Sequence, residues 1–127
     1  MKPTFLIIGT QKGGTSAGIF YLNQHADVFM PKGEPHFFDE HYDKGIEWYE
    51  NQFFNGNKHY IRKQQRGEKT PIYCFFRHSM DRIKEHYPDI QRVIISGMEP
   101  DAVHIRQLEI EQVLLKPINL ALLSKLV

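Results

Sequence analysis

A short apolar run that leads directly into a glycine-rich turn constrains the fold of this chain more than any other feature. Phe5 to Ile8 are continuously apolar, and Gly9 ends the run. Such a run is typical of a strand buried on both faces of a parallel sheet. The turn is followed by Thr15 to Gln24, a proline-free stretch that predicts a helix packed on the strand. We therefore expect an α/β unit that begins with strand, turn and helix.

The later segments alternate in the same way. The further elements that we predict are a short strand at Val28–Met30, helices at Ile46–Phe53 and Ser79–His86, and a strand at Gln91–Ser96. Ser79 is expected to be the N-cap of its helix, with Pro88 just past the end. We interpret Lys58 to Gly67 as a polar, basic connection that faces solvent or an anionic glycan, and Asp101 to Leu115 as a helix. The alternation predicts an α/β fold, a parallel sheet flanked by helices.

The size and charge of the chain exclude several other classes. Its 127 residues are enough for one domain with a single core, and its net charge of +1 offers no broad field to attract nucleic acid. The one cysteine, Cys74, rules out an internal disulfide, and we interpret it as a small buried hydrophobe rather than a reactive thiol. The apolar run near Met1 is too short for a signal-peptide core or a membrane span, so a cytoplasmic protein is expected.

The glycine-rich turn has the composition of an anion-binding loop. Backbone amides at such a turn point toward a common centre, the helix N-terminus adds partial positive charge, and glycines let a phosphate approach closely. The spacing of Gly9, Gly14 and Ser16 nearly fits the nucleotide-triphosphatase pattern G-x-x-x-x-G-K-[ST]. Thr15, however, stands where the lysine of that pattern should be, and Lys12 lies inside the loop instead. This departure disfavours a nucleotide kinase, and a glycine-rich turn without a ligand stays an alternative.

The displaced lysine favours a transferring group with fewer charges. A triphosphate usually needs a lysine on its terminal phosphates and a magnesium ion. A sulfuryl group carries fewer formal charges, so one lysine with hydroxyl and amide donors is sufficient without a metal. The sequence has neither a magnesium-binding aspartate after a hydrophobic strand nor a histidine pair with the H-E-x-x-H spacing of zinc sites. We therefore predict no metal.

The turn resembles the 5′-phosphosulfate loop of sulfotransferases that use 3′-phosphoadenosine 5′-phosphosulfate (PAPS). Three later segments strengthen the resemblance, in the order Glu34–Asp39 (EPHFFD), Gly45–Tyr49 (GIEWY) and Glu68–Tyr73 (EKTPIY). In this order they are similar to the branch that includes heparan sulfate sulfotransferases and their bacterial relatives. The resemblance covers residues 4 to 95. It implies a P-loop-like parallel sheet, a truncated version of the three-layer sulfotransferase fold.

The resemblance also implies which residues bind the co-substrate PAPS and transfer its sulfuryl group. Catalytic roles fall on Lys12, which would balance charge on the departing phosphate, and on Glu34, which would deprotonate the acceptor. The residues that would bind PAPS are Gln11, Lys12, Gly13, Gly14, Thr15 and Ser16. From its neighbours alone, Glu34 is expected to lie against the aromatic pair Phe37 and Phe38, which would raise the pKa of its carboxyl group. A solvated loop glutamate is the alternative for Glu34.

Lys69 and His36 are the candidates for contact with the acceptor substrate. The motif that contains Lys69 is similar to one that places a lysine near the acceptor and the sulfate. A plain surface ion pair is the alternative for Lys69, which follows Glu68 in the sequence. His36 is a second candidate base or acceptor contact, and a structural histidine beside Phe37 and Phe38 is its alternative.

The segment that should hold the 3′-phosphate of PAPS departs from the family pattern. An arginine is expected after a strand like Gln91–Ile95, but the chain continues Ser-Gly-Met-Glu-Pro-Asp. We therefore divide the chain into residues 1–95, the N-terminal part of a sulfotransferase domain, and residues 96–127, a divergent tail that a truncation or frameshift would explain. An inactive fragment that keeps only the 5′-phosphosulfate cradle is accordingly the alternative function. The acceptor stays open, with a sugar hydroxyl or amine favoured by the resemblance, and no nucleic-acid or membrane partner is expected.

Overall fold

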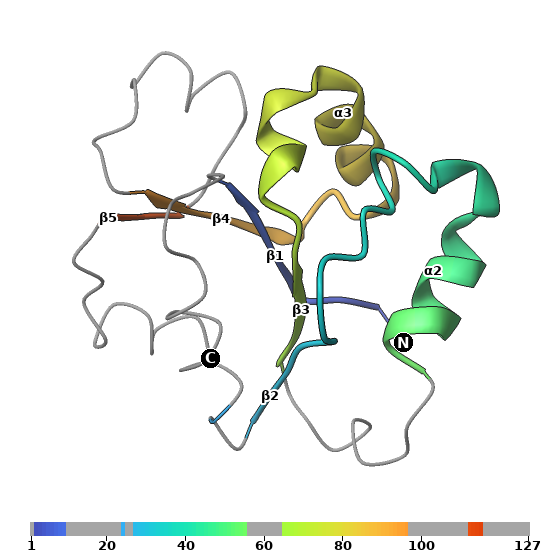
Figure 1. Cartoon of the computed structure of the whole chain (residues 1–127), viewed down its shortest axis with the longest axis horizontal. Coiled ribbons are helices and arrows are strands. Elements are labelled where there is room, and N and C mark those ends of the chain that lie inside the picture. The colour runs from blue at the N-terminus through green and yellow to red at the C-terminus, as the bar shows by residue number, and fades with distance from the viewer. Residues whose placement is uncertain (1, 10–23, 25–26, 56–64, 97–111, 116–127) are drawn as a thin grey trace.

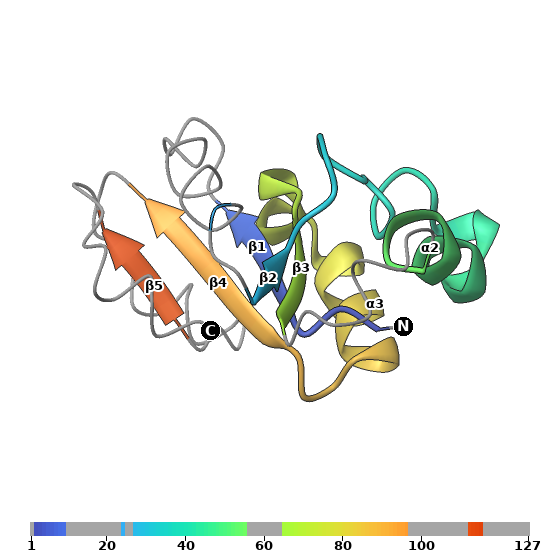
Figure 2. The same ribbon diagram turned by 90° about the horizontal axis from the view of Figure 1, so that it is seen from below.

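Five parallel strands form the sheet at the centre of the described part of the chain (Figure 1). The computed structural model describes residues 2–9, 24, 27–55, 65–96 and 112–115. The strands are β1 (Phe5–Gly9), β2 (Val28–Phe29), β3 (Gln65–Lys69), β4 (Gln91–Ser96) and β5 (Gln112–Leu115). They lie in the order β2-β3-β1-β4-β5, and every neighbouring pair is parallel. Figure 2 shows the arrowheads of β1, β4 and β5 pointing the same way. The predicted α/β fold with a parallel sheet is thus confirmed.

β1 is buried on both faces, as its unbroken apolar sequence predicts. Leu6 and Ile8 belong to the main hydrophobic core, and the alternation of side chains along a strand turns Phe5 and Ile7 to the opposite face. All four side chains are completely buried. Because burial of each such side chain contributes roughly 1.5 to 3 kcal/mol, β1 is the element that anchors the sheet.

An aromatic-rich layer covers the face of the sheet that carries Leu6 and Ile8. Its helical elements are the 3-10 helices η1 (Tyr42–Lys44) and η3 (Pro71–Phe75) and the α-helices α2 (Ile46–Phe53) and α3 (Arg77–His86). Phe37 stacks on Tyr49 from α2 with 4.5 Å between ring centroids, and it meets Phe38 edge-on at 4.9 Å. Stacked and edge-to-face pairs of this kind stabilise a core beyond the area they bury. The segment between β2 and α2 is therefore anchored in the core by its two phenylalanines.

The helix predicted at Ile46–Phe53 is confirmed as α2, but the start predicted for the next helix is wrong. α3 begins at Arg77, and its N-cap is Phe76, which makes no side-chain capping hydrogen bond. Ser79 lies buried inside the helix, where its Oγ donates to the carbonyl oxygen of Phe38 at 3.1 Å. Ser79 therefore links α3 to the aromatic layer. Its hydroxyl bonds to the carbonyl oxygen of a distant residue instead of capping the helix N-terminus.

The interpretation of Lys58 to Gly67 as a connection is wrong at its end, because Gln65 begins β3. β3 reads Gln-Arg-Gly-Glu-Lys, without one apolar side chain, yet it pairs with both β1 and β2. Gly67 lies opposite Phe5, and a Cβ atom added to Gly67 would collide with the Phe5 ring. The ring of Phe5 thus fills the space that a side chain at position 67 would occupy, and the middle of a strand with no hydrophobic pattern, Gly67 and Glu68, is buried.

The remaining predictions fall partly outside the described residues. The helix at Thr15–Gln24 is described only at Gln24, which is helical. The end of the helix predicted at Asp101–Leu115 instead forms β5, which pairs with β4, so the helix prediction is wrong there. The strands predicted at Val28–Met30 and Gln91–Ser96 are confirmed as β2 and β4. Within the described ranges, no helix is long and apolar enough to cross a membrane.

Candidate active site

The carboxyl ends of β1 and β3 lie side by side at one edge of the sheet. β1 ends at Gly9, β3 ends at Lys69, and the loop that follows β2 carries Glu34 and His36. The chain continues from β1 to β2 and from β3 to β4, and β2 and β4 lie on opposite sides of β1 in the sheet. Ligands of parallel α/β sheets bind at such a switch point, outside the carboxyl ends of the strands. This edge is therefore the candidate active site.

Gly9, the last residue of β1, is also the first glycine of the glycine-rich segment, and it lies at this edge. A Cβ atom on Gly9 would lie only 2.7 Å from Sγ of Cys74, so glycine is required for β1 to end this close to η3. Cys74 is buried, as predicted, and burial raises the pKa of its thiol to about 11. The residues predicted to bind PAPS lie outside the described residues, and they are Gln11, Lys12, Gly13, Gly14, Thr15 and Ser16.

Glu34, His36 and Lys69 form one cluster at the carboxyl edge. One carboxylate oxygen of Glu34 lies 3.6 Å from Nε2 of His36, and the other lies 4.0 Å from Nζ of Lys69. The exposed fractions of the three side chains are 37% for Glu34, 28% for His36 and 18% for Lys69. The fold thus brings a predicted catalytic carboxylate together with both predicted substrate-contact residues, in a place that solvent can reach.

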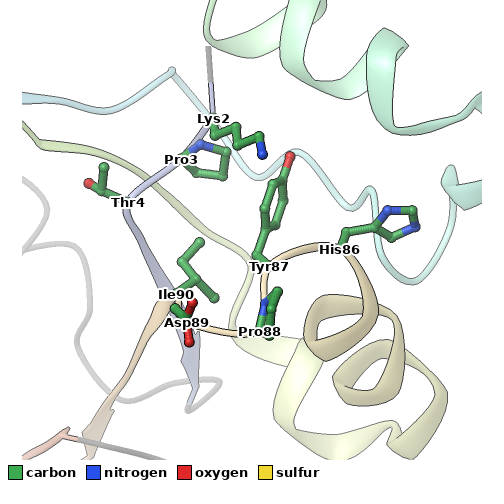
Figure 3. A pocket seen from close by; sticks show the side chains of 8 residues that line it. All are labelled: Lys2, Pro3, Thr4, His86, Tyr87, Pro88, Asp89 and Ile90. Atoms are coloured by element: carbon green, nitrogen blue, oxygen red, sulfur yellow. The ribbon is translucent and has the colours of Figure 1, made fainter.

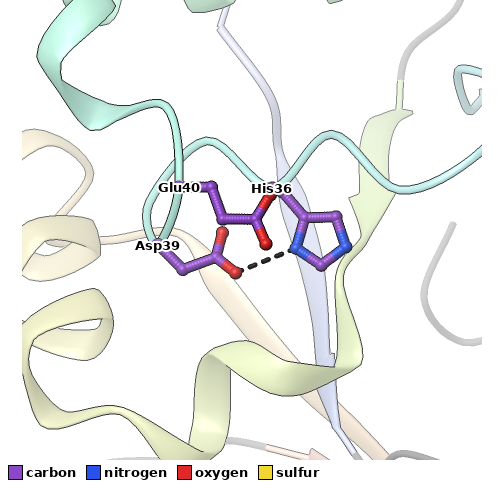
Figure 4. A group of neighbouring side chains, drawn as sticks. All are labelled: His36, Asp39 and Glu40. Atoms are coloured by element: carbon purple, nitrogen blue, oxygen red, sulfur yellow. Dashed lines mark hydrogen bonds and ion pairs between the residues drawn. The ribbon is translucent and has the colours of Figure 1, made fainter.

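His36 is held between two carboxylates. Its Nδ1 lies 2.8 Å from Oδ2 of Asp39, the hydrogen bond drawn in Figure 4, and its Nε2 faces Glu34. Burial lowers the pKa of His36, but the hydrogen bond and the charges of Asp39, Glu40 and Glu34 outweigh burial and raise it above 6.5. The backbone of His36 has a φ angle of 50°, an uncommon value for a residue with a side chain. These contacts fix the position of the His36 ring, and both the role in acceptor contact and the structural role stay predictions.

The surroundings of Glu34 differ from the aromatic walls that its sequence neighbours suggest. Phe37 and Phe38 are completely buried in the core, whereas the side chain of Glu34 is 37% exposed and lies beside Nε2 of His36 and Nζ of Lys69. The difference arises because the loop turns at His36, so the residues before and after the turn face different surroundings. Any role of Glu34 as a base therefore depends on His36 and Lys69 rather than on an apolar pocket.

Glu68 is a feature of the site region that the sequence analysis missed. Its side chain is 1% exposed, and its carboxylate accepts hydrogen bonds from the hydroxyls of Tyr49, Thr70 and Tyr73. Burial raises the pKa of Glu68 from 4.5 to about 7, although the three hydroxyls pull it down. Lys69, the next residue, has its ion pair with Glu34 instead, and this contact is compatible both with the plain ion pair and with a role in the site. The sequence signal was the glutamate in a segment rich in hydroxyls, EKTPIY.

Three side chains of the described residues are close enough to share a cation. Ligand atoms of His36, Asp39 and Glu40 lie within 4.8 Å of one another (Figure 4). The Nδ1 atom of His36 is already hydrogen-bonded to Asp39, and Glu40 is 63% exposed. The geometry is accounted for by the hydrogen bond, and we assign no ion to this group.

A hollow of about 400 Å³ lies at the other edge of the sheet (Figure 3). It is lined by Lys2, Pro3, Thr4, His86, Tyr87, Pro88, Asp89 and Ile90. These residues precede β1 and β4, so the hollow lies at the amino ends of the strands. Because ligands of parallel sheets bind at the carboxyl ends, the hollow is separate from the candidate active site.

Comparison with curated proteins finds relatives of this chain by sequence. No protein-family model matches the chain. Over 93 residues, or 73% of the chain, it is 38% identical to heparan sulfate glucosamine 3-O-sulfotransferase 3B1 of Homo sapiens, of which the match covers 23%. It is also 38% identical over 96 residues to heparan sulfate glucosamine 3-O-sulfotransferase 5 of Homo sapiens, of which the match covers 26%. The chain therefore spans about a quarter of the length of these relatives.

A solved structure has a similar fold. The crystal structure of a sulfotransferase from Alicyclobacillus acidocaldarius superimposes with a TM-score of 0.60 and 28% sequence identity. The superposition covers 74% of this chain and 44% of that one.

Proposed function

Because this chain is homologous to part of the sulfotransferases, as its motifs predicted, we propose that it transfers a sulfuryl group from PAPS to a hydroxyl or amine acceptor. One observation carries the proposal. Glu34 contacts His36 from its own motif and Lys69 from a second motif. A carboxylate, an imidazole and an ammonium group therefore lie together at the carboxyl edge of the sheet. Transfer of a sulfuryl group needs a base for the acceptor and cations for the sulfate oxygens, and this cluster supplies both types.

The reaction divides between the turn after β1 and the cluster. In the proposal, the turn residues 11–16 bind the phosphosulfate of PAPS, and Lys12 balances the charge that develops on the departing phosphate. Glu34 removes the proton of the acceptor, whose oxygen or nitrogen forms a bond to sulfur as the bond from sulfur to the 5′-phosphate oxygen breaks. The products are the sulfated acceptor, adenosine 3′,5′-bisphosphate and a proton held on Glu34.

The neighbours of Glu34 have distinct roles in this scheme. Asp39 accepts a hydrogen bond from Nδ1 of His36, which leaves Nε2 to contact Glu34 and the acceptor. Lys69 lies 4.0 Å from Glu34, close enough for its ammonium group to bind a sulfate oxygen while the carboxylate takes the proton. The base and the cation are thus held as a pair at one position.

We further propose that the acceptor is a carbohydrate. The relatives at 37–38% identity are named as heparan sulfate glucosamine 3-O-sulfotransferases, and this name supports a sugar hydroxyl or amine as the acceptor. We place the transfer site within residues 1–95, and β5 from residues 96–127 extends the sheet beside β4. PAPS as donor, the absence of a metal requirement and a cytoplasmic location stay predictions.

A transfer assay with radiolabelled PAPS and a panel of glycan acceptors tests the proposal. Glu34→Gln keeps the size of the side chain but removes the base, and we expect it to lower the transfer rate by a factor of about 100 or more. Lys12→Ala should have an effect of similar size. Glu47→Gln, on an exposed position of α2, is the matched control and should leave the rate unchanged. Full activity in Glu34→Gln would contradict the proposed role of the base.

Calorimetry separates the proposal from its alternatives. Binding of adenosine 3′,5′-bisphosphate together with measurable transfer supports a sulfotransferase. Binding without transfer to any acceptor supports the cradle-only fragment instead. Magnesium-dependent binding of ATP in place of the bisphosphate would favour the nucleotide kinase.

A further inference from the structure

A buried carboxylate lies directly beneath the loop that carries the candidate base. Glu68 is the register partner of Leu6, so its side chain points into the aromatic layer, whereas the next residue, Lys69, points toward Glu34. The side chain of Glu68 is only 1% exposed. A buried carboxylate is costly unless it is hydrogen-bonded, so its partners decide what it does.

Three hydroxyl groups satisfy the carboxylate of Glu68. Oε2 accepts hydrogen bonds from Tyr49 at 2.6 Å and from Tyr73 at 3.0 Å, and Oε1 accepts one from Thr70 at 2.7 Å. An ionised carboxylate only accepts hydrogen bonds, so each hydroxyl must direct its hydrogen toward Glu68. The lone pairs of each hydroxyl oxygen are then free to face elsewhere.

Two of these hydroxyls accept backbone hydrogen bonds from the candidate active-site loop. The amide of His36 donates to Oγ1 of Thr70 at 3.3 Å. The amides of Phe37 and Phe38 donate to the hydroxyl oxygen of Tyr73 at 3.0 and 3.4 Å. Three consecutive amides of the loop are thus bound to hydroxyls whose orientation is set by one carboxylate. This includes His36, whose backbone adopts an uncommon conformation that needs such support.

We propose that Glu68 is a positioning residue, which through the hydroxyls of Thr70 and Tyr73 fixes the backbone of the loop that presents Glu34 and His36 to the acceptor. The part of this inference that concerns catalysis rests on the proposed function, whereas the effect on the loop does not. Because its side chain is only 1% exposed, Glu68 is not placed to touch a bound substrate. It acts by orienting the hydroxyl groups of Thr70 and Tyr73, whose hydrogens point toward Glu68.

The groups that face Glu68 are consistent with a role for its charge. They are Tyr49 from α2, Tyr73 from η3, Asp39 from the loop and Tyr87 after α3. Burial raises the pKa values of the three tyrosines, so they stay protonated and keep their hydroxyl hydrogens at neutral and moderately alkaline pH. Asp39 is the other acidic neighbour: its Oδ2 accepts a hydrogen bond from His36, and its buried Oδ1 has no hydrogen-bond partner among the described residues.

Amide hydrogen exchange, followed residue by residue in the full chain by NMR, tests the loop effect without any assay of activity. At about pH 8.5, where Glu68 is ionised, Glu68→Gln should speed exchange of the His36, Phe37 and Phe38 amides about tenfold or more. The amide group of glutamine must donate as well as accept, so it cannot receive all three hydroxyl hydrogens. Glu47→Gln is the control and should leave these amides unchanged.

Two further variants keep the test decisive if Glu68→Gln fails to fold. Thr70→Val should speed exchange at His36 but not at Phe37 and Phe38, whereas Tyr73→Phe should do the reverse. A general weakening of the fold would instead speed exchange across the sheet. Equal effects of both variants on all three amides, or no effect in Glu68→Gln, would overturn the proposal.

Transfer kinetics test the catalytic part. Glu68→Gln should lower kcat about tenfold or more and leave the affinity for adenosine 3′,5′-bisphosphate unchanged, since the loop faces the acceptor. A loss of bisphosphate affinity equal to the loss of kcat would overturn the assignment to the loop. If the unmodified chain shows no transfer, the proposed function fails, while the exchange measurements still decide whether Glu68 fixes the loop.

Discussion

Replacing Glu68 by glutamine should change how the stability of the protein depends on pH. Burial raises the pKa of Glu68 from 4.5 to about 7, against the opposing effect of hydrogen bonds from Tyr49, Thr70 and Tyr73. In the unfolded chain the carboxyl group returns to its ordinary value. Between the two pKa values the folded chain holds a proton that the unfolded chain has released, so the free energy of unfolding falls as the pH rises.

The magnitude follows from the two pKa values. A shift from 4.5 to about 7, at about 1.4 kcal/mol per unit, corresponds to a contribution of about 3 kcal/mol. This contribution is fully present at a pH below 4.5 and is lost as the pH rises through about 7. Glutamine does not titrate. The free energy of unfolding of the wild-type chain, relative to that of Glu68→Gln, should therefore fall by about 3 kcal/mol across this window.

Urea unfolding, followed by circular dichroism at a series of pH values from about 5 to about 8.5, measures the difference. Asp39 and the other titrating groups are present in both proteins, so their contributions cancel to first order. Glu47→Gln, which alters an exposed glutamate, should follow the wild-type curve at all pH values. A difference that stays flat or rises with pH would refute the reasoning, because it would mean that the three hydroxyls outweigh burial and keep Glu68 ionised.

Two substitutions and one thiol-labelling reaction test the packing around the site. Gly67→Ala should lower the free energy of unfolding by about 1 to 3 kcal/mol in urea unfolding, because its Cβ meets the ring of Phe5; an unchanged midpoint would show that the ring moves aside freely. Ser79→Ala removes the hydrogen bond to the carbonyl of Phe38 and should cost about 1 kcal/mol in the same measurement, whereas a stabilising effect would contradict the role of that bond. Cys74 should react with a thiol reagent at neutral pH more than about tenfold slower than a free cysteine, because it is buried and its thiol pKa is about 11; rapid labelling of the folded chain would contradict its burial.

Local patterns in the sequence were sufficient wherever one short segment carries its own signal. The apolar run of β1 predicts a strand buried on both faces, and the spacing of Ile46, Tyr49 and Phe53 predicts α2. The motifs from residues 34 to 39 and from 68 to 73 contain Glu34, His36 and Lys69, which the fold brings together, and their roles stay predictions. These features depend on residue type and spacing within a few positions, which is information that the sequence holds directly.

Tertiary contacts decided the features that depend on partners distant in the chain. β3 has no hydrophobic pattern, and Gly67 at its centre is buried because the ring of Phe5 from β1 fills the space beside it. The chain turns at His36 between Glu34 and the buried phenylalanines, and the amide of His36 donates a hydrogen bond to Thr70, a residue 34 positions later. The burial of Glu68 could not be predicted for the same reason. Whether a polar residue is buried is determined by the hydrogen-bond partners that the fold brings to it, and those partners come from α2, η3 and the residue that follows β3.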